Sequence, residues 1–322
     1  MRFLTNTSTD PYFNLAFDEY CLENVGKDET YFFLWRNRPS VIVGLNQNVF
    51  AEVNLQYLQD HGITLARRVT GGGAVYHDLQ NLNYTIIGRD PSPEPVAQAL
   101  RTLGADVVMT GRNDLFVDGK KCSGYARRVS HGREIIHGTL MYDVDLETLS
   151  RVLDVPGSKM QAKGIASVRS RVGNLKDYLP QFDSLDGLQE ALQGLLSDGD
   201  AQMEIYPEDI RQVKLLADSK FSTWDFIYGH SRQADFTRKA KLPCGTVEAA
   251  FRLDRGIITG VDFSGDFLFR EPVVGLAGRL VGTRFAADGI KQVLGGTDIG
   301  AYFPGTTVEE LLVSLFGFTL KK

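Results

Sequence analysis

Cysteine is scarce in this chain of 322 residues, and neither sign of charge dominates it. The three cysteines, Cys21, Cys122 and Cys244, lie far apart and form no CxxC pair or other metal-like spacing. Such an odd, sparse set indicates reduced thiols and predicts a cytoplasmic protein. The net charge of −5, from 40 acidic and 35 basic residues, argues against a protein built to bind nucleic acid.

Long apolar runs are also missing. No stretch approaches the roughly 20 apolar residues of a membrane-spanning helix, and the first ten residues contain no apolar segment, so we expect neither a membrane anchor nor a signal peptide. The hydrophobic fraction of 43% is ordinary for a globular protein. A chain of this length is long for one core and therefore predicts two domains.

Helices and strands alternate irregularly along the first 240 residues. Apolar residues at helical spacing and short strand-like runs between turn residues give the assignment. Because no regular βαβ alternation is visible, we expect an α+β fold rather than a doubly wound sheet. The expected strands are 31–36, 41–44, 63–69, 82–87, 105–109 and 133–144, and the expected helices include 12–24, 145–153, 184–199 and 207–221.

The texture of the sequence changes near residue 240. The polar segment 237–245 contains a proline and a glycine and is interpreted as a linker. Residues 246–267 alternate like a hairpin, and three short helices are expected after it, at 271–281, 286–294 and 307–316. We therefore predict a larger domain over 1–241 and a small α+β domain over 246–322.

The segment RRVTGGGAVYHD (67–78) is the most informative part of the chain. Three glycines directly after a strand allow a close backbone approach and free N–H groups for an anion. Arg67 and Arg68 add fixed positive charge, which predicts a phosphate or acyl-phosphate site. Neighbouring strand residues face opposite sides, so we favour Arg68 for the ligand and interpret Arg67 as structural. A flexible glycine-rich turn is the alternative, and neither a P-loop nor a GxGxxG spacing is present.

A second basic segment extends from Arg112 to Arg133. Asp118–Gly119 predicts a tight hairpin turn, which brings Lys121 into the second strand. A lysine that points inward there must meet an anion such as a phosphate, whereas a lysine that points outward would simply be solvated. His137, at the start of a strand, either lines a pocket or is structural. The basic segment 163–175 also has side chains able to reach acidic groups.

Several multi-residue stretches, taken in order, resemble the lipoate–protein ligase family. The similarity covers about residues 8–180, and the C-terminal region resembles the accessory domain of the long bacterial form. The stretches are DPYFNLAFDEY (10–20), LWRNRPSVIVGLNQN (34–48), RRVTGGGAVYHDLQNLN (67–83), GRNDLFVDGKKCSG (111–124), and HGTLMYDVDLETL (137–149) with KGIASVRSRV (163–172).

The resemblance implies a biotin/lipoate-ligase-like α+β domain with a mixed sheet, plus a small α+β accessory domain. It implies that lipoate and ATP, with Mg²⁺, give lipoyl-AMP and pyrophosphate, and that the lipoyl group then passes to a lysine. The implied partners are lipoyl acceptor domains of 2-oxoacid dehydrogenase complexes or the glycine cleavage H protein. The implied protein is a cytoplasmic monomer that binds no nucleic acid or membrane.

The resemblance also implies roles for individual residues. Lys121 would contact the lipoyl carbonyl and phosphate oxygens as the catalytic cation, and Asp114 would be the candidate Mg²⁺ ligand. The residues that would hold the substrate or adenylate are Arg68, Thr70, Gly71, Gly72, Gly73, Ala74, Val75, Asn81, Asn83, Asn113, Asp114, Ala126, His137 and Gly138.

Other functions compete with this one. An octanoyl- or lipoyl-transferase on the same fold would move an acyl group between carrier proteins, either with a cysteine nucleophile or directly from a thioester. Neither Cys21 nor Cys122 is placed as such a nucleophile. A biotin ligase is disfavoured because its GRGRxGR-type loop is absent, and a non-catalytic lipoate- or acceptor-binding module is a third possibility. Lipoate-dependent ATP–pyrophosphate exchange distinguishes a ligase from the others.

Overall fold

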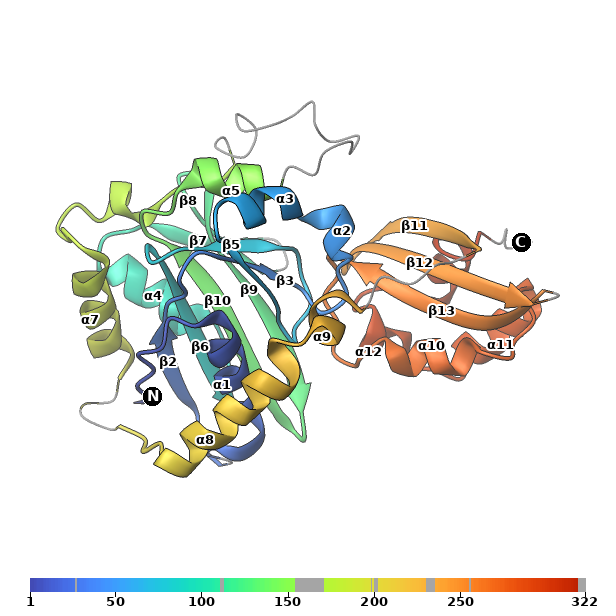
Figure 1. The fold of residues 1–322 in the computed structure, drawn as a ribbon, viewed down its shortest axis with the longest axis horizontal. Helices are drawn as coiled ribbons and strands as arrows, with labels where there is room; N and C mark the ends of the chain where they lie inside the picture. The colour runs from blue at the N-terminus through green and yellow to red at the C-terminus, as the bar shows by residue number, and fades with distance from the viewer. Residues whose placement is uncertain are drawn as a thin grey trace.

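The structure, a computed structural model, describes residues 1–26, 28–110, 113–153, 171–197, 199, 202–229, 235–254 and 256–317. Two lobes are visible, a larger one that extends from the N-terminus to α9 (Trp224–Tyr228) and a smaller C-terminal one (Figure 1). None of the helices in these ranges is both long and apolar enough to cross a membrane.

A seven-stranded mixed sheet forms the centre of the larger lobe. Its strands are antiparallel to their neighbours except for the parallel pair β1–β2. In spatial order they are β1 (Arg2–Phe3), β2 (Tyr31–Trp35), β6 (Asn81–Gly88), β10 (Arg133–Met141), β9 (Lys120–Ser130), β8 (Asp114–Val117) and β7 (Val107–Thr110).

Helices cover both faces of this sheet. Ile86 and Ile136 point into a core closed by α4 (Glu94–Thr102) and α7 (Leu185–Leu196), a helix that follows the 3₁₀ turn Leu175–Tyr178. Their neighbours in sequence, such as Ile87, point to the opposite core, which is closed by a second set of helices. Burial on both faces explains why the central strands are almost entirely apolar. Those helices are α1 (Pro11–Asn24), α8 (Pro207–Leu216) and the π-helical turn Ala217–Phe221.

A second, three-stranded sheet carries the glycine loop. β3 (Ser40–Val43) lies at its centre, parallel to β4 (Thr64–Arg67) and antiparallel to β5 (Val75–His77). The loop that joins β4 to β5 passes so close to Gly44 that a Cβ on Gly44 would lie 2.1 Å from the Gly72 carbonyl oxygen. Only glycine fits there. The helices beside this sheet are α2 (Val49–Glu52), α3 (Leu55–Asp60) and α5 (Leu146–Val152).

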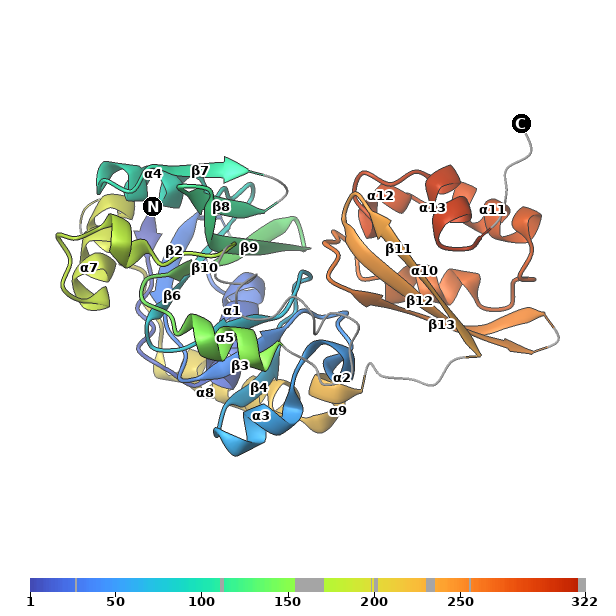
Figure 2. The same cartoon turned by 90° about the horizontal axis from the view of Figure 1, so that it is seen from above.

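The C-terminal lobe has its own sheet and core, as Figures 1 and 2 show. The sheet order is β11–β12–β13, and helices lie along it. The elements are β11 (Phe236–Leu242), β12 (Gly245–Asp254), β13 (Ile257–Gly265), α10 (Val274–Leu280), α11 (Ala287–Gly295), α12 (Ile299–Tyr302) and α13 (Val308–Ser314). The predicted hairpin and the three predicted helices are confirmed, and α12 is additional.

The linker predicted over 237–245 is wrong. Residues 236–242 form strand β11, which pairs with β12 along its whole length, and 243–245 lead into β12. Ala240 and Leu242 are buried, whereas Arg238 and Lys239 are exposed. An edge strand with one buried face carries many charges, and for this reason its sequence looks like a linker.

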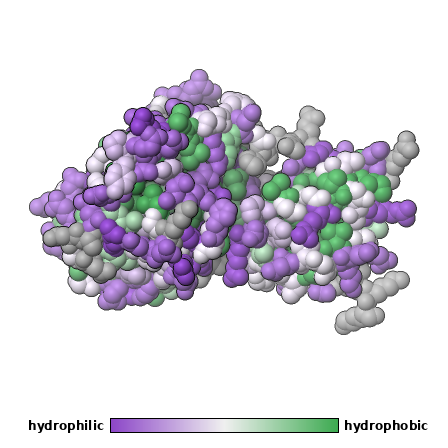
Figure 3. Space-filling model, turned by 90° about the horizontal axis from the view of Figure 1, so that it is seen from below, coloured by the Kyte–Doolittle hydropathy of each residue, from purple (hydrophilic) through white to green (hydrophobic). Residues whose placement is uncertain are grey.

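Apolar side chains also lie on the outer surface of this lobe (Figure 3). Val274 of α10 is 74% exposed and Val281, just after the same helix, is 49% exposed. The C-terminal lobe therefore keeps apolar surface outside its own core.

Arg67 is a fully buried charged side chain of the larger lobe. It donates to the main-chain oxygens of Gly44, Leu45 and Gln47 at 2.8–2.9 Å, and to those of the α9 residues Phe226 and Ile227 at 2.5–3.0 Å. Burial lowers the pKa of Arg67 to about 10, so the guanidinium remains charged at neutral pH. One side chain thus ties the loop after β3 to the last helix of the lobe.

Replacing Arg67 by methionine should lower the free energy of unfolding by roughly 3–5 kcal/mol, because several buried carbonyls lose their donor. Urea denaturation followed by circular dichroism measures this. Arg211→Met, at an exposed position of α8, is the matched control and should change stability by less than about 0.5 kcal/mol. A loss below about 1 kcal/mol for Arg67→Met would contradict the assigned role.

Candidate active site

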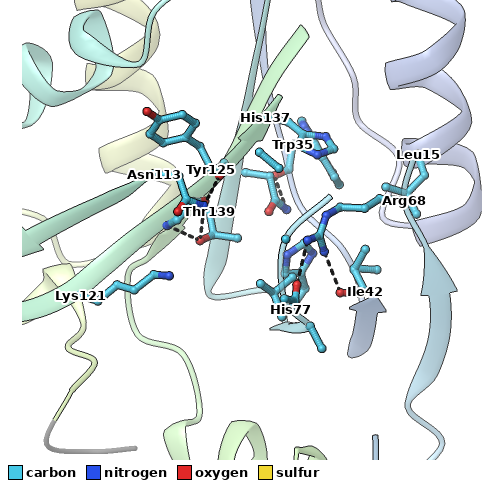
Figure 4. A pocket seen from close by; sticks show the side chains of 18 residues that line it. Leu15, Trp35, Ile42, Arg68, His77, Asn113, Lys121, Tyr125, His137 and Thr139 are labelled. Atoms are coloured by element: carbon cyan, nitrogen blue, oxygen red, sulfur yellow. Dashed lines mark hydrogen bonds between the residues drawn. The ribbon is translucent and has the colours of Figure 1, made fainter. Parts of the chain in front are cut away.

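A pocket with a cavity volume of about 130 Å³ lies between the seven-stranded sheet and the glycine loop (Figure 4). Its walls come from α1, β2, β3, the β4–β5 loop, β6, β9 and β10, so segments far apart in sequence converge there. Most residues predicted for the site line this pocket. They are Arg68, Gly72, Gly73, Ala74, Val75, Asn83, Asn113, Lys121, Ala126, His137 and Gly138.

The remaining predicted residues do not line the pocket themselves. Gly71 is covered by the C-terminal lobe, and a Cβ there would lie 2.4 Å from the Phe267 carbonyl oxygen. Asn81 donates to Asn83 Oδ1 at 3.0 Å and so supports a lining residue. Thr70 is hydrogen-bonded to the lining residue Arg68, and Asp114 forms an ion pair with the lining residue Lys121. Of the basic segment 163–175, residues 163–170 lie outside the described part of the chain.

Sequence reasoning missed several lining residues. His77 lies two residues after Val75 in β5, so the two side chains lie on the same face of the strand. This pattern could have been found in the sequence. The aromatic and aliphatic members, by contrast, looked like ordinary core residues. The missed residues are Leu15, Trp35, Ile42, His77, Gly124, Tyr125 and Thr139.

Strand register aligns the pocket floor. His137 of β10 lies between Thr85 of β6 and Ala126 of β9, and Gly138 lies between Tyr84 and Tyr125. A Cβ on Gly138 would lie 2.5 Å from the Tyr84 ring, so glycine is needed where these strands meet.

A β-bulge aims Lys121. Leu115 pairs with Ser123 but Phe116 pairs with Lys121, which leaves Cys122 as the extra residue of β9. The preceding Asp118–Gly119 turn has positive φ at both residues, as the sequence predicted. The bulge places Lys121 Nζ in the pocket wall, 2.7 Å from Asp114 Oδ1. A Cβ on Gly124 would lie 2.8 Å from Nζ, so this glycine leaves room for the lysine.

Arg68 is buried and shapes the glycine loop. Its Nη2 donates to the carbonyl oxygens of Gly71 and Gly73 at 2.6 and 2.8 Å, and its Nη1 donates to Ile42 O at 3.0 Å. Burial and the neighbouring Arg67 lower the pKa of Arg68 to about 9, so it remains a cation at neutral pH. As expected from strand alternation, Arg68 faces the pocket and Arg67 the interior.

A buried hydrogen-bonded chain connects α1 to this arginine. Asp18 Oδ2 lies 2.7 Å from His137 Nδ1, and His137 Nε2 lies 2.7 Å from Thr70 Oγ1. Arg68 Nε donates to the same hydroxyl at 3.1 Å. A carboxylate only accepts, so Nδ1 carries a proton, while Nε2 shares a hydrogen bond with the Thr70 hydroxyl. Both nitrogens of His137 are therefore occupied within the protein.

Three arginines of the basic segment 112–133, namely Arg127, Arg128 and Arg133, do not form a patch of unpaired positive charge. Arg133 is buried and donates to Leu22 O at 2.8 Å. Arg127 pairs with Glu134, and Arg128 pairs with Glu19, whose carboxylate also binds a lysine. These carboxylates come from β10 and α1, so the neutralisation was not visible in the basic segment itself.

Comparison with known proteins agrees with this geometry. The family model of the lipoyl protein ligase A/B catalytic domain matches residues 10–196, and that of the bacterial lipoate protein ligase C-terminus matches residues 231–315. Lipoate–protein ligase 1 of Staphylococcus aureus is 37% identical over 325 residues, which cover 97% of this chain and 99% of the relative. The chain belongs to the lipoate–protein ligase family, a family of enzymes of the ligase class.

Two solved structures have the same fold over the catalytic lobe. A lipoate–protein ligase A bound with ATP has a TM-score of 0.61 and 30% identity, covering 71% of this chain and 98% of its own. A bipartite ligase of Thermoplasma acidophilum, described together with its E2 lipoyl domain, has a TM-score of 0.64 and 32% identity, covering 73% and 98%. The predicted α+β class and ligase-like fold are confirmed.

Thr70→Val, which removes the hydroxyl but keeps the shape, should lower the free energy of unfolding by roughly 1–3 kcal/mol. His137 Nε2 would lose its partner, and Arg68 Nε would keep only its bond to Gly71 O. Thr70→Ser keeps the hydroxyl and should cost less than about 1 kcal/mol. Urea denaturation of both variants tests the chain, and equal losses would show that the hydroxyl is not its link.

Proposed function

We propose that this chain activates lipoate with ATP to lipoyl-AMP and transfers the lipoyl group to a lysine of an acceptor protein. The observation that carries the proposal is one pocket that joins an apolar wall to two cations. Leu15, Trp35 and Ile42 suit an aliphatic acyl chain, whereas Lys121 and Arg68 suit the phosphate end of an adenylate.

The chemistry asks for cations and for no nucleophile from the protein. Adenylate formation passes through a pentavalent phosphorus with added negative charge, and transfer passes through a tetrahedral oxyanion. A lysine ammonium at those oxygens stabilises both. The attacking group of the second step is the acceptor lysine, and AMP departs.

The cysteines do not favour a cysteine-dependent transferase. Cys21 is fully buried, and burial raises its pKa well above that of an ordinary thiol. Burial raises the pKa of Cys122 to about 12. A thiol held in its protonated form is a poor nucleophile, which supports the ligase over that alternative.

Mg²⁺ would enter with ATP. In nucleotide sites this ion commonly uses one or two carboxylates together with phosphate oxygens. Among the residues that the structure describes, no cluster of three or more His, Cys, Asp or Glu side chains is placed to hold a metal. Asp114, beside Lys121, is the carboxylate that fits, and the ion would neutralise charge on the departing pyrophosphate.

The acceptors we propose are lipoyl domains of 2-oxoacid dehydrogenase complexes or the glycine cleavage H protein. The E2 lipoyl domain described with the archaeal neighbour supports this class. We further propose that the enzyme is a monomer in the cytoplasm, where its three buried cysteines would stay reduced.

Lys121→Ala should lower lipoate-dependent ATP–pyrophosphate exchange, and transfer from supplied lipoyl-AMP, by about 10²–10³ each. The neighbouring Lys120, whose stem contacts Gly173, does not line the pocket. Lys120→Ala is therefore the matched control and should retain near-normal rates. A damaging Lys120→Ala with an active Lys121→Ala would overturn the assignment, and no exchange even in the wild type would favour a transferase.

We propose that the C-terminal lobe begins before Phe236 and covers the site during adenylation. Its main chain contacts both loops beside the pocket, because Gly72 N donates to Phe267 O at 3.2 Å and Gly265 N donates to Asn46 O at 2.9 Å. A lobe that contacts the larger one through these loops can move aside for an acceptor domain. While closed, it would protect the adenylate from water.

Truncation after Gly229 should impair adenylation far more than transfer from supplied lipoyl-AMP. This site is preferred to one near residue 241, which would leave β11 without its sheet. The half-reactions are timed separately on a truncated enzyme shown to be folded. Unchanged adenylation would leave the lobe as a stabilising or partner-binding appendage.

A further inference from the structure

A second histidine of the pocket has an unused donor. His77 is 4% exposed, yet it forms part of the pocket wall together with Val75 (Figure 4). Its Nδ1 lies 3.0 Å from Asn37 Nδ2. Its Nε2 is buried and has no hydrogen-bond partner within the described ranges of the chain.

Main-chain carbonyls fix the direction of the hydrogen bonds that reach this ring. Asn14 Nδ2 contacts the carbonyl oxygens of Ser8 and Arg36 at 3.0 and 2.9 Å, and carbonyls only accept. This nitrogen carries two hydrogens and cannot accept, so the Asn37 atom 2.8 Å from it is the oxygen Oδ1, which shares a hydrogen with one of the two carbonyls. Asn37 then turns its own amide nitrogen toward His77, and Nδ1 of the ring must accept.

It follows that the ring proton of His77 is on Nε2. Burial, with further contributions from Arg68 and His137, lowers the pKa of His77 to about 3, so the ring is neutral at neutral pH. His77 is thus a neutral donor with a fixed tautomer. A buried N–H without an acceptor is costly, which indicates that something in the pocket accepts from it.

The two pocket histidines differ in this respect. One ring nitrogen of His137 is hydrogen-bonded to Asp18 and the other to Thr70. It therefore lines the site without a donor to offer, whereas His77 holds its ring by one nitrogen and leaves the other for a ligand.

We propose that His77 Nε2–H donates a hydrogen bond to an oxygen of the bound acyl-adenylate, either the acyl carbonyl or the α-phosphate. The proposal rests on the function proposed above. Oxygen is the acceptor we assign because the sulfur and carbon atoms of a lipoyl chain accept weakly or not at all.

The direct test is NMR of the full-length protein labelled with ¹⁵N-histidine, which contains only five imidazoles. The free enzyme should show His77 with a protonated Nε2 and an unprotonated Nδ1. A saturating lipoyl sulfamoyl adenosine, which replaces the phosphate by a sulfamate, should shift the Nε2 proton downfield. If the accepting oxygen belongs to the acyl group, lipoate alone should reproduce the shift. If it belongs to the phosphate, AMP alone should reproduce it.

Two NMR results would overturn the proposal. One is a proton on Nδ1, and the other is an unchanged His77 resonance while other signals report saturation. If no signal responds to the analogue, the proposed ligase function fails together with the proposal. A response of other signals alone refutes only the role of His77.

Binding measurements with variants give a second test. His77→Phe should weaken the analogue about tenfold, the effect of one hydrogen bond. His77→Gln keeps an N–H donor and should lose less. His61→Phe, at an exposed ring bonded only to its own helix, is the control and should bind normally. Equal affinity of His77→Phe and wild type, or equal losses for the Phe and Gln variants at matched melting temperatures, would contradict the donor role.

Discussion

Two adjacent buried guanidinium groups hold together the parts of the molecule that form the site. Arg67 binds the carbonyls of the loop after β3 and of α9, and Arg68 binds those of the glycine loop. Both loops contact the C-terminal lobe, through Asn46 and Gly72. Buried positive charge is costly unless acceptors surround it. Here main-chain carbonyls supply them, so the backbone of both loops is fixed by the requirement to satisfy the arginines.

These constraints also distribute charge within the pocket. Burial, with a further contribution from Arg68, lowers the pKa of His77, and Asp18 and Thr70 occupy both nitrogens of His137. Beside the two cations, the site contains His77 as a neutral ring of fixed orientation. Neither Arg68 nor His77 is close to titration at neutral pH, so the anion binding that we propose would not depend on the protonation of these two groups there.

Local patterns predicted the parts of the site that depend on neighbouring residues. The glycine loop, the Asp118–Gly119 turn and the opposite faces of Arg67 and Arg68 all follow from short-range geometry. Asp18 was missed because a carboxylate in α1 resembles a helix surface position, and only the packing of α1 on β10 buries it beside His137. The linker predicted over 237–245 was wrong because the segment is strand β11, whose pairing with β12 hides one face of a polar stretch of sequence.

Lys121 complements the fixed arginine because it is free to exchange partners. Its side chain and that of Asp114 are 37% and 27% exposed, and an ion pair this accessible to water contributes only about 0–1 kcal/mol. Breaking it is therefore cheap when a more highly charged phosphate arrives. Gly124 gives the ammonium space in which to move. Arg68 by contrast is held by its carbonyls. In the reaction that we propose, Arg68 would maintain the shape of the loop, while Lys121 would follow the negative charge from the phosphate oxygens to the acyl carbonyl oxygen.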